Sequence, residues 1–185
     1  MEEKNYEIKV DKKDIRKSWW IWYLGAEVSN SYERLQSLIF CASMTPVLKK
    51  LYKDKAELSE ALKRHLNFYN TEGIAGSIVN GITIAMEEQK ANNEQGSTDA
   101  AITGIKTGLM GPIAGIGDSI IWAAVMPIII ALFLPFAING NALGAIMPII
   151  LYTGVTVLIG YYLCIKGYVI GKNSILQLLQ DGKVK

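Results

Sequence analysis

The chain has 185 residues, half of them hydrophobic, and only 19% are Asp, Glu, Lys or Arg, against about a quarter in typical soluble domains. This high apolar fraction excludes global disorder, and two cysteines are too few for a disulfide scaffold. A formal net charge of +2 gives no support for nucleic-acid binding, which needs a clustered basic face.

The first 17 residues are rich in charges of both signs and contain no apolar signal-peptide core. We therefore expect a polar N-terminal tail over residues 1–17. An aromatic cluster follows at Trp19–Leu24, preceded by Arg16 and Lys17. Because Trp and Tyr beside basic residues are typical of the headgroup level of a bilayer, this pattern favours an amphipathic helix on the cytoplasmic face. The alternative is the start of an ordinary core helix.

Three short uncharged stretches lie in the region 18–118: Leu35–Leu48 and Gly73–Met86, with 14 residues each, and Thr107–Gly117, with 11. None is long enough to span a bilayer as a straight helix, which needs about 20 residues. Each contains Gly or Pro, so we expect short, broken, re-entrant helices that need neighbouring protein to be stable. The charged residues between the last two stretches predict a polar loop over residues 87–99, outside the membrane.

The longest uncharged run, Ser119–Ile165, contains 47 residues, enough for two membrane-spanning helices. The tripeptide Asn139-Gly140-Asn141 divides it where a turn is needed. Soluble helices of this length nearly always keep a charged stripe, so a buried hairpin of a soluble protein is the weaker alternative. The predicted fold is therefore an all-α integral membrane protein that contains a two-span transmembrane hairpin over residues 119–165.

A basic C-terminal tail is predicted over residues 166–185, whereas the turn between the two spans has no basic residue. By the positive-inside tendency, both outer ends of the hairpin face the cytoplasm.

Three polar residues, Asn30, Glu33 and Gln36, are candidates for ligand binding. They are spaced by three residues, which places them on one side of a helix. Their amides and carboxylate suit the hydroxyl groups of a sugar, and nearby aromatic residues could cover its apolar face. The alternative is an exposed helix end in which Glu33 pairs with Arg34.

Asp118 is the second candidate, because it lies at the start of the long apolar run. An Asp at such a place is most often a helix N-cap. The alternative is a buried carboxylate that serves a polar ligand or a partner chain. Upstream of it, the glycine pairs Gly104/Gly108 and Gly111/Gly115 predict close packing between helices.

No residue set for catalysis, a metal or a cofactor is found in the sequence. His65, the single histidine, lies in a charged helical segment expected at the surface, without metal ligands at suitable spacing. Cys41 and Cys164 lie in apolar stretches and are expected to be reduced and buried. The chain is therefore expected to bind and conduct a ligand rather than to catalyse a reaction.

Four segments together resemble the IID component of mannose/fructose/sorbose-family phosphotransferase systems (PTS). In Asn30–Gln36, Tyr-Glu-Arg-Leu-Gln is similar to the family's Tyr-Glu-Arg-Met-Gln motif. The others are Leu48–Tyr52, Lys63–Thr71 and Lys106–Ser119, of which the last, with GLMGPIAGIGDS, is the most specific. The resemblance runs from about residue 17 to about residue 171.

The resemblance implies a permease subunit of a bacterial cell (inner) membrane, multi-pass and without catalytic residues of its own. It would pair with a IIC membrane subunit in a hetero-oligomer, and a cytoplasmic IIA/IIB phosphocarrier would phosphorylate a hexose or related sugar during uptake. The motif match assigns Asn30, Glu33 and Gln36 to the sugar. It assigns to the transport core or subunit interface Gly111, Pro112, Gly115, Gly117, Asp118 and Ser119.

Family members usually continue well beyond the segment that ends here at Gly171, so we expect a chain that lacks the family's C-terminal region. This departure leaves a second hypothesis open, in which the chain is a truncated, non-transporting membrane interaction or receptor protein.

Overall fold

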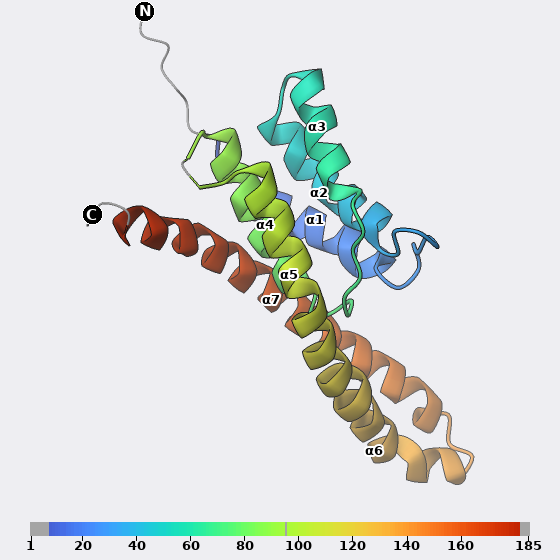
Figure 1. Cartoon of the computed structure of the whole chain (residues 1–185). Helices are drawn as coiled ribbons and strands as arrows, with labels where there is room; N and C mark the ends of the chain where they lie inside the picture. Colours follow the sequence, from blue (N-terminus) through green and yellow to red (C-terminus); the bar gives the residue numbers. More distant parts are fainter. Residues whose placement is uncertain (1–7, 95, 182–185) are drawn as a thin grey trace, which may run out of the picture.

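The computed structural model describes residues 8–94 and 96–181, with side chains up to residue 173. Within this part of the chain all regular secondary structure is helical (Figure 1). The elements in chain order are α1 (Lys12–Gly25), α2 (Ser37–Leu51), α3 (Lys55–His65), α4 (Ser77–Ala91), α5 (Asp99–Gly117), η1 (Asp118–Val125), α6 (Met126–Ile138) and α7 (Leu143–Asp181).

The helix α1 begins inside the segment that was expected to be a polar tail. Asp11 is its N-cap and forms a capping box with Asp14, in which each side chain accepts a hydrogen bond from the other residue's backbone N–H. Ile15, one residue further, is buried in the core. The predicted tail is therefore wrong for residues 12–17, and residues 1–7 lie outside the described part.

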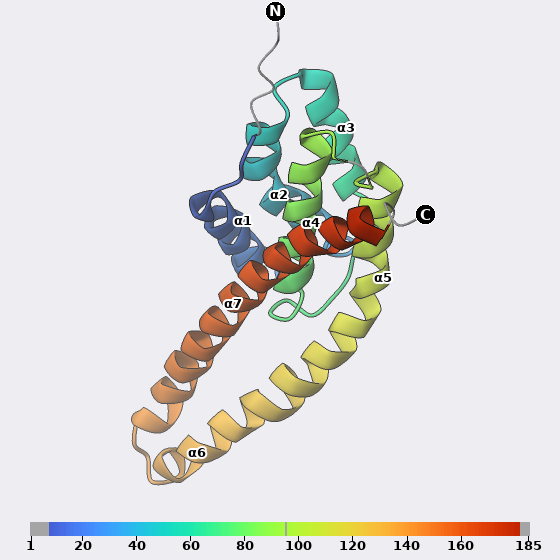
Figure 2. The same ribbon diagram turned by 90° about the vertical axis from the view of Figure 1, so that its left-hand side faces the viewer.

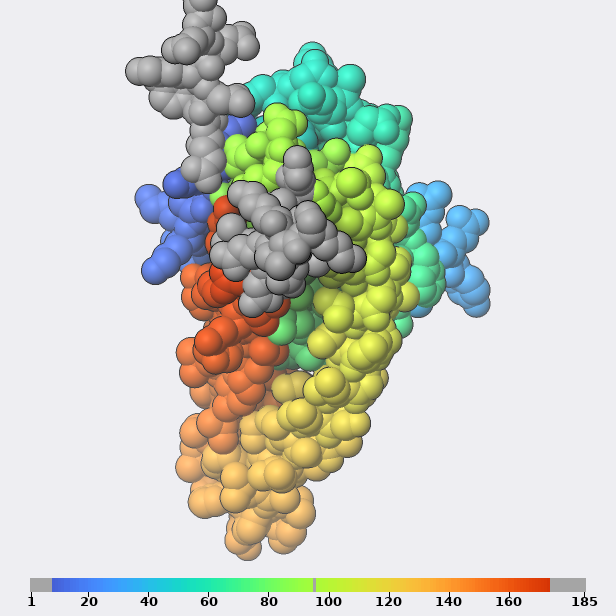
Figure 3. All heavy atoms as spheres, turned by 60° about the vertical axis from the view of Figure 1, so that its left-hand side comes forward, coloured from blue at the N-terminus to red at the C-terminus, as the bar shows by residue number. Residues whose placement is uncertain are grey.

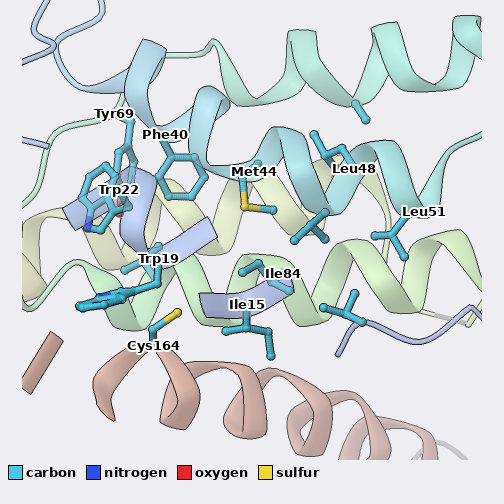
Figure 4. Packing of buried hydrophobic residues seen from close by; sticks show 14 of the residues in the cluster. Ile15, Trp19, Trp22, Phe40, Met44, Leu48, Leu51, Tyr69, Ile84 and Cys164 are labelled. Atoms are coloured by element: carbon cyan, nitrogen blue, oxygen red, sulfur yellow. The ribbon is translucent and has the colours of Figure 1, made fainter. Parts of the chain in front are cut away.

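The aromatic cluster on α1 has a buried side in the protein core, whereas Trp20 on the same helix is exposed. Trp19 and Trp22 are buried, and the Trp22 Nε1–H donates to the carbonyl oxygen of Gly73 at 2.8 Å. The rings of Phe40 and Tyr69 pack against Trp22, with centroids 5.7 and 5.9 Å away (Figure 4). The two buried tryptophans agree with the alternative of a core helix, because their three-residue spacing directs them to one buried face. Contact of the other face of α1 with a membrane surface stays a prediction.

The first two short apolar stretches form unbroken core helices. Both α2 and α4 have 15 residues, and Pro46 lies inside α2 without ending it. α4 also continues to Ala91, where the loop 87–99 was expected, and only residues 92–98 connect it to α5. That loop is wrong because Glu87 and Glu88 are buried and paired inside the body instead of exposed. Re-entry of these helices into a membrane stays a prediction.

The third stretch, Thr107–Gly117, is also unbroken, because α5, η1 and α6 follow one another as a continuous rod from Asp99 to Ile138. Pro112 removes one backbone donor, and the helical bonds on both sides of it keep the rod intact. The turn at Asn139-Gly140-Asn141 is confirmed, and Gly140 adopts a φ of +71°, which favours glycine. After the turn, α7 returns alongside α6 (Figures 1 and 2).

Two helical stretches, Asp99–Ile138 and Leu143–Asn173, are long and apolar enough to cross a membrane. Large hydrophobic side chains along α6 and α7 are exposed, and the hairpin extends away from the body in the space-filling view (Figure 3). The two predicted apolar helices are thus present, and both are longer than 119–165 implied; that they span a membrane stays a prediction. The tail predicted for 166–185 is wrong as far as Asp181, because α7 continues through it.

The crossing of α4 and α7 depends on glycines that the sequence did not single out. A Cβ on Gly81 would lie 2.0 Å from the carbonyl oxygen of Cys164, and one on Gly167 would lie 2.1 Å from that of Ile78. By contrast, Gly104 and Gly111, like Gly108 and Gly115, have open space where a Cβ would stand. The close packing between helices that glycine allows is therefore present in this protein. Within this chain it lies between α4 and α7 and not at the glycines of α5.

Candidate functional site

A polar cavity of about 370 Å³ lies where the α1–α2 connection, residues 70–72 and the α5–η1 junction meet. It is lined by three carboxylates, three amides, one hydroxyl, one tryptophan and one alanine: Glu27, Glu72, Asp118, Asn30, Gln36, Asn70, Thr71, Trp122 and Ala114. Three of the residues that the sequence put forward, from two distant motifs, are therefore brought together here.

Gln36 belongs to the part of the cavity wall that the α1–α2 connection contributes, and hydrogen bonds fix its position. It is 3% exposed, its Oε1 accepts the Thr71 N–H at 2.8 Å, and its own backbone N–H donates to Tyr69 at 2.9 Å. Thr71 in turn donates through Oγ1 to the carbonyl oxygen of Met110 on α5, at 3.1 Å. These bonds tie three separate segments together and fix the position of the glutamine amide.

The segment from Asn30 to Gln36 is a tight connection, so the expected helix face is wrong. Ser31 and Leu35 exchange two backbone hydrogen bonds, of 3.0 and 2.9 Å, and Leu35 adopts a φ of +45°. This turn directs Asn30 and Gln36 to the cavity, whereas Glu33 is exposed and does not line it.

Glu72 forms the buried side of the cavity, with 4% of its surface exposed. Its two carboxylate oxygens accept the backbone N–H groups of Ile74 at 3.0 Å and Ala75 at 2.6 Å. A Cβ on Gly117 would lie 2.5 Å from its Oε2, so only glycine allows α5 to approach this carboxylate. Gly117 is thus required by the cavity and not by a break in the helix.

Asp118 is not a helix N-cap, because it lies inside the continuous rod and its backbone N–H donates to Ala114 and Gly115. Asp118 lines the cavity but is exposed, so the alternative of a buried carboxylate is also wrong, and its service to a ligand or a partner chain stays a prediction. Asp118 begins the π-helical segment η1, which also contributes Trp122 to the lining. Segments of π-helix are frequent at functional sites.

The remaining residues assigned from the glycine-rich motif lie outside the cavity. Gly111, Pro112, Gly115 and Ser119 are exposed on the outer face of the rod, and the Ser119 hydroxyl donates to the Gly115 carbonyl oxygen at 2.8 Å. The glycines of the motif therefore lie on two sides of the rod. Gly117 faces the interior, whereas the other glycines form an exposed outer face.

The electrostatic character of the cavity is acidic. Partial burial of the Glu27 carboxyl raises its pKa, and the negative charges of Glu72 and Asp118 act in the same direction. The backbone N–H of Gly73 acts on this pKa in the opposite direction. Among the described residues, no group of three or more His, Cys, Asp or Glu side chains is placed to hold a metal ion. Chemically, the cavity offers hydrogen bonds to hydroxyl groups and negative charge.

Sequence reasoning missed a second polar group, which is buried between α3, α4 and α5. Glu87 accepts hydrogen bonds from Arg64, His65 and Tyr52, and all four side chains are buried. Lys106 is fully buried close by, with its ammonium 5.0 Å from the centre of the Phe40 ring. The sequence does contain a pattern that indicates burial of His65. This residue follows Leu58, Ala61 and Leu62 at helical spacing, so it falls on the apolar stripe of α3.

Comparisons with known proteins point to one family. The family model described as "PTS system mannose/fructose/sorbose family IID component" matches residues 9–185. The mannose-specific EIID component of Escherichia coli K12 is 42% identical over 75% of this chain and 49% of its own length. The fructose permease IID component of Bacillus subtilis is 41% identical over 83% of this chain and 54% of its own length. The chain thus spans about half the length of these relatives.

Two solved structures are similar to this chain in fold. The chain matches a subunit in the cryo-EM structure of the mannose transporter ManYZ in complex with microcin E492 with a TM-score of 0.83 and 39% identity, over 90% of this chain and 61% of that one. A structure described as a membrane protein matches with a TM-score of 0.80 and 36% identity, over 95% of this chain and 67% of that one.

Proposed function

The chain belongs to the mannose/fructose/sorbose-family IID components of the phosphotransferase system, and from this premise we propose that it is a membrane-embedded permease subunit whose polar cavity contacts the transported sugar. One observation carries the proposal. Asn30 and Gln36 from one family motif and Asp118 from another line the same cavity, although more than 80 residues separate them. Amides and carboxylates suit the paired hydroxyls of a sugar, and Trp122 offers apolar surface to its ring.

The exposed face of α5 supports a partner membrane subunit of the IIC type. Gly104, Gly108, Gly111 and Gly115 follow one another at intervals of four, three and four residues, which places them on one stripe of the helix. Nothing lies within 4 Å of where their Cβ atoms would stand. Such a stripe lets a second helix approach closely in lipid. A cytoplasmic IIA/IIB phosphocarrier would then phosphorylate the sugar, and the complex would lie in the bacterial inner membrane.

The sugar site is tested with asparagines inside and outside the cavity. Asn30→Ala and Asn70→Ala each remove a lining amide, whereas Asn67→Ala removes an exposed amide outside it. Sugar binding to the complex extracted from its native membrane is measured for each variant. We expect both lining variants to weaken binding by about tenfold, since one hydrogen bond contributes about 1 kcal/mol and a polar partner is left unpaired. Equal binding by all three variants would exclude the cavity as the sugar site.

The partner face is tested by Gly108→Leu, which places a bulky side chain on the open stripe, with Gly154→Leu as control on the open surface of α7. We expect the first variant alone to lose the co-purifying subunit.

The second hypothesis, a truncated and non-transporting membrane interaction protein, is not favoured, because the family model and the relatives that match the chain are transport components.

A further inference from the structure

We propose that one side of α1 binds anionic phospholipids, with its basic residues at the lipid phosphates and its apolar residues among the acyl chains. This outer stripe of α1 consists of five exposed side chains: Lys13, Arg16, Lys17, Trp20 and Leu24. The inference rests on the membrane-embedded subunit proposed above. It is independent of the sugar site, because none of the five residues lines the cavity.

The spacing of these residues places two kinds of side chain in order along the helix. Positions 13, 17, 20 and 24 follow one another at intervals of four, three and four residues, and Arg16 lies one turn before Trp20. Trp20 is 39% exposed and Leu24 is 68% exposed. The first half of the stripe is therefore basic and the second half is apolar. This order suits the border between lipid headgroups and acyl chains.

The positive charges of the stripe have no counter-charge in the described part of the protein. The side chains of Lys13, Arg16 and Lys17 form no ion pair with any described residue. By contrast, Asp14 on the same helix pairs with Lys50 of α2 at 2.5 Å. The helix thus directs a carboxylate to its neighbour and leaves three cations on the outside. The phosphate groups of anionic lipids are complementary to such a cluster of cations.

Contacts between α1 and α7 place the apolar half of the stripe beside the apolar hairpin. The hydroxyl groups of Tyr23 and Thr156 share a hydrogen bond of 2.9 Å, and the ring centres of Trp19 and Tyr161 are 5.2 Å apart. The order of these two contacts shows that the helices run in opposite directions. The second half of the stripe therefore lies at the height of residues 156–161, which carry no charge.

The basic half of the stripe lies where α7 also becomes basic. The uncharged run on α7 ends at Ile165, and Lys166 follows it. One turn earlier, Tyr162 is 59% exposed, and the Lys166 ammonium lies 5.5 Å from the centre of its ring. At 1.5 Å per residue, Arg16 lies about 4.5 Å beyond Trp19 in the direction of Lys166. Both helices therefore change from aromatic to basic at one height, which is typical of the level of the lipid phosphates.

The experiment places the complex, extracted with its partner subunits, in bilayer discs and measures quenching of Trp20 by brominated lipids. The Trp20 signal is the difference in fluorescence between the wild-type chain and Trp20→Phe. Phosphatidylglycerol and phosphatidylcholine with the same brominated acyl chains are compared in a background of unbrominated phosphatidylcholine. A Lys or Arg near an anionic surface favours binding by about fivefold. We therefore expect half-maximal quenching at an at least about fivefold lower fraction of the anionic lipid, and salt at about 1 M to reduce this difference.

Charge-neutral variants assign the preference to the stripe. The combined variant Lys13→Gln, Arg16→Gln and Lys17→Gln should make the two lipids quench Trp20 equally. The matched control removes the same charge from exposed residues of α2, α3 and their connection, with Lys49→Gln, Lys53→Gln and Lys55→Gln. No large hydrophobic residue between positions 39 and 67 is exposed beside them. The control should therefore keep the full preference for the anionic lipid.

Each other outcome overturns the inference in a defined way. If neither lipid quenches Trp20, a partner subunit covers the stripe. If both lipids quench the wild-type chain equally, the stripe contacts lipid without a preference for negative charge. A preference that survives the combined variant, or that the control also loses, does not belong to α1. Sugar binding by the combined variant is measured in parallel and should equal that of the wild type, so failure of this inference is distinguishable from failure of the sugar site.

Discussion

Arg64 and Glu87 form a two-pronged ion pair inside the protein, with Nε 2.7 Å from Oε1 and Nη2 2.9 Å from Oε2. The side chain of Glu87 is 0% exposed, and His65 and Tyr52 also donate to it, at 2.9 and 2.8 Å. The carboxylate thus joins α3 and the end of α2 to α4, and it explains how charged residues near the end of α4 come to lie in the core.

Replacement of this carboxylate should be costly. Glu87→Gln leaves the buried Arg64 guanidinium with only the exposed Asp99 carboxylate as counter-charge, at 2.7 Å from Nη1. Loss of the buried partner of such a pair typically costs up to about 3–5 kcal/mol. Thermal unfolding of the detergent-extracted protein measures the effect. Glu60→Gln, at an exposed pair with Lys63, should change stability by less than about 1 kcal/mol. Similar melting temperatures for the two variants would contradict this assignment.

Stability should fall on acidification in two steps. Burial lowers the pKa of His65, so the unfolded chain takes up this proton first, and stability declines as the pH falls below about 6.5. Although burial opposes it, hydrogen bonds from His65 and Arg64 lower the pKa of Glu87 to about 2, so its contribution is lost as the pH falls from about 4.5 towards 2. Unfolding measured between pH 7 and pH 5 tests the first step, which His65→Gln should abolish. A slope that persists in this variant belongs to another group.

Lys106 should be replaceable by an apolar residue of similar length. It is fully buried, and its ammonium has no hydrogen-bond partner among the described residues, only the faces of Phe40 and Tyr69 at 5.0 and 5.6 Å. Because a buried unpaired charge is expensive, Lys106→Met should leave stability unchanged or raise it by about 1–3 kcal/mol. A clear loss in urea unfolding would show that the two ring contacts outweigh the desolvation of the charge.

The α4–α7 crossing should not tolerate one extra methyl group. In Gly81→Ala the new Cβ meets the backbone of Cys164, which cannot rotate away, so the helices must separate at a cost of about 1–3 kcal/mol. Gly154→Ala adds the same group in open space and should be neutral or slightly stabilising. The comparison of the two unfolding curves decides whether this crossing determines stability.

Gly117→Ala should damage the cavity more than the fold. The added Cβ would displace the Glu72 carboxylate, which is held by two backbone N–H groups, so we expect binding of the sugar to weaken by at least about tenfold at unchanged abundance in the membrane. Binding is measured beside Gly154→Ala. Wild-type affinity in Gly117→Ala would show that Glu72 can move without consequence for the ligand.

Local sequence was sufficient for the features that depend on local composition. The long uncharged run predicted two apolar helices, and Asn139-Gly140-Asn141 predicted the turn between them, since both follow from solubility in lipid and from backbone freedom at Gly140. The four motif segments, of which the one around Asp118 is the most specific, were also sufficient to name the family.

Tertiary packing decided where the polar residues lie. Trp22, Arg64 and Glu87 were expected at surfaces and are buried, because each finds a partner on another helix: Trp22 with Gly73, and Arg64 with Glu87. Glu33 was expected to bind ligand and faces outward, because Ser31 and Leu35 close a turn where a helix was expected. Spacing along one segment specifies which side chains share a face. Only long-range contacts, such as the hydrogen bond from Thr71 to Gln36, specify which part of the protein that face packs against. Contacts of this kind bring Asn30, Gln36 and Asp118 to one cavity.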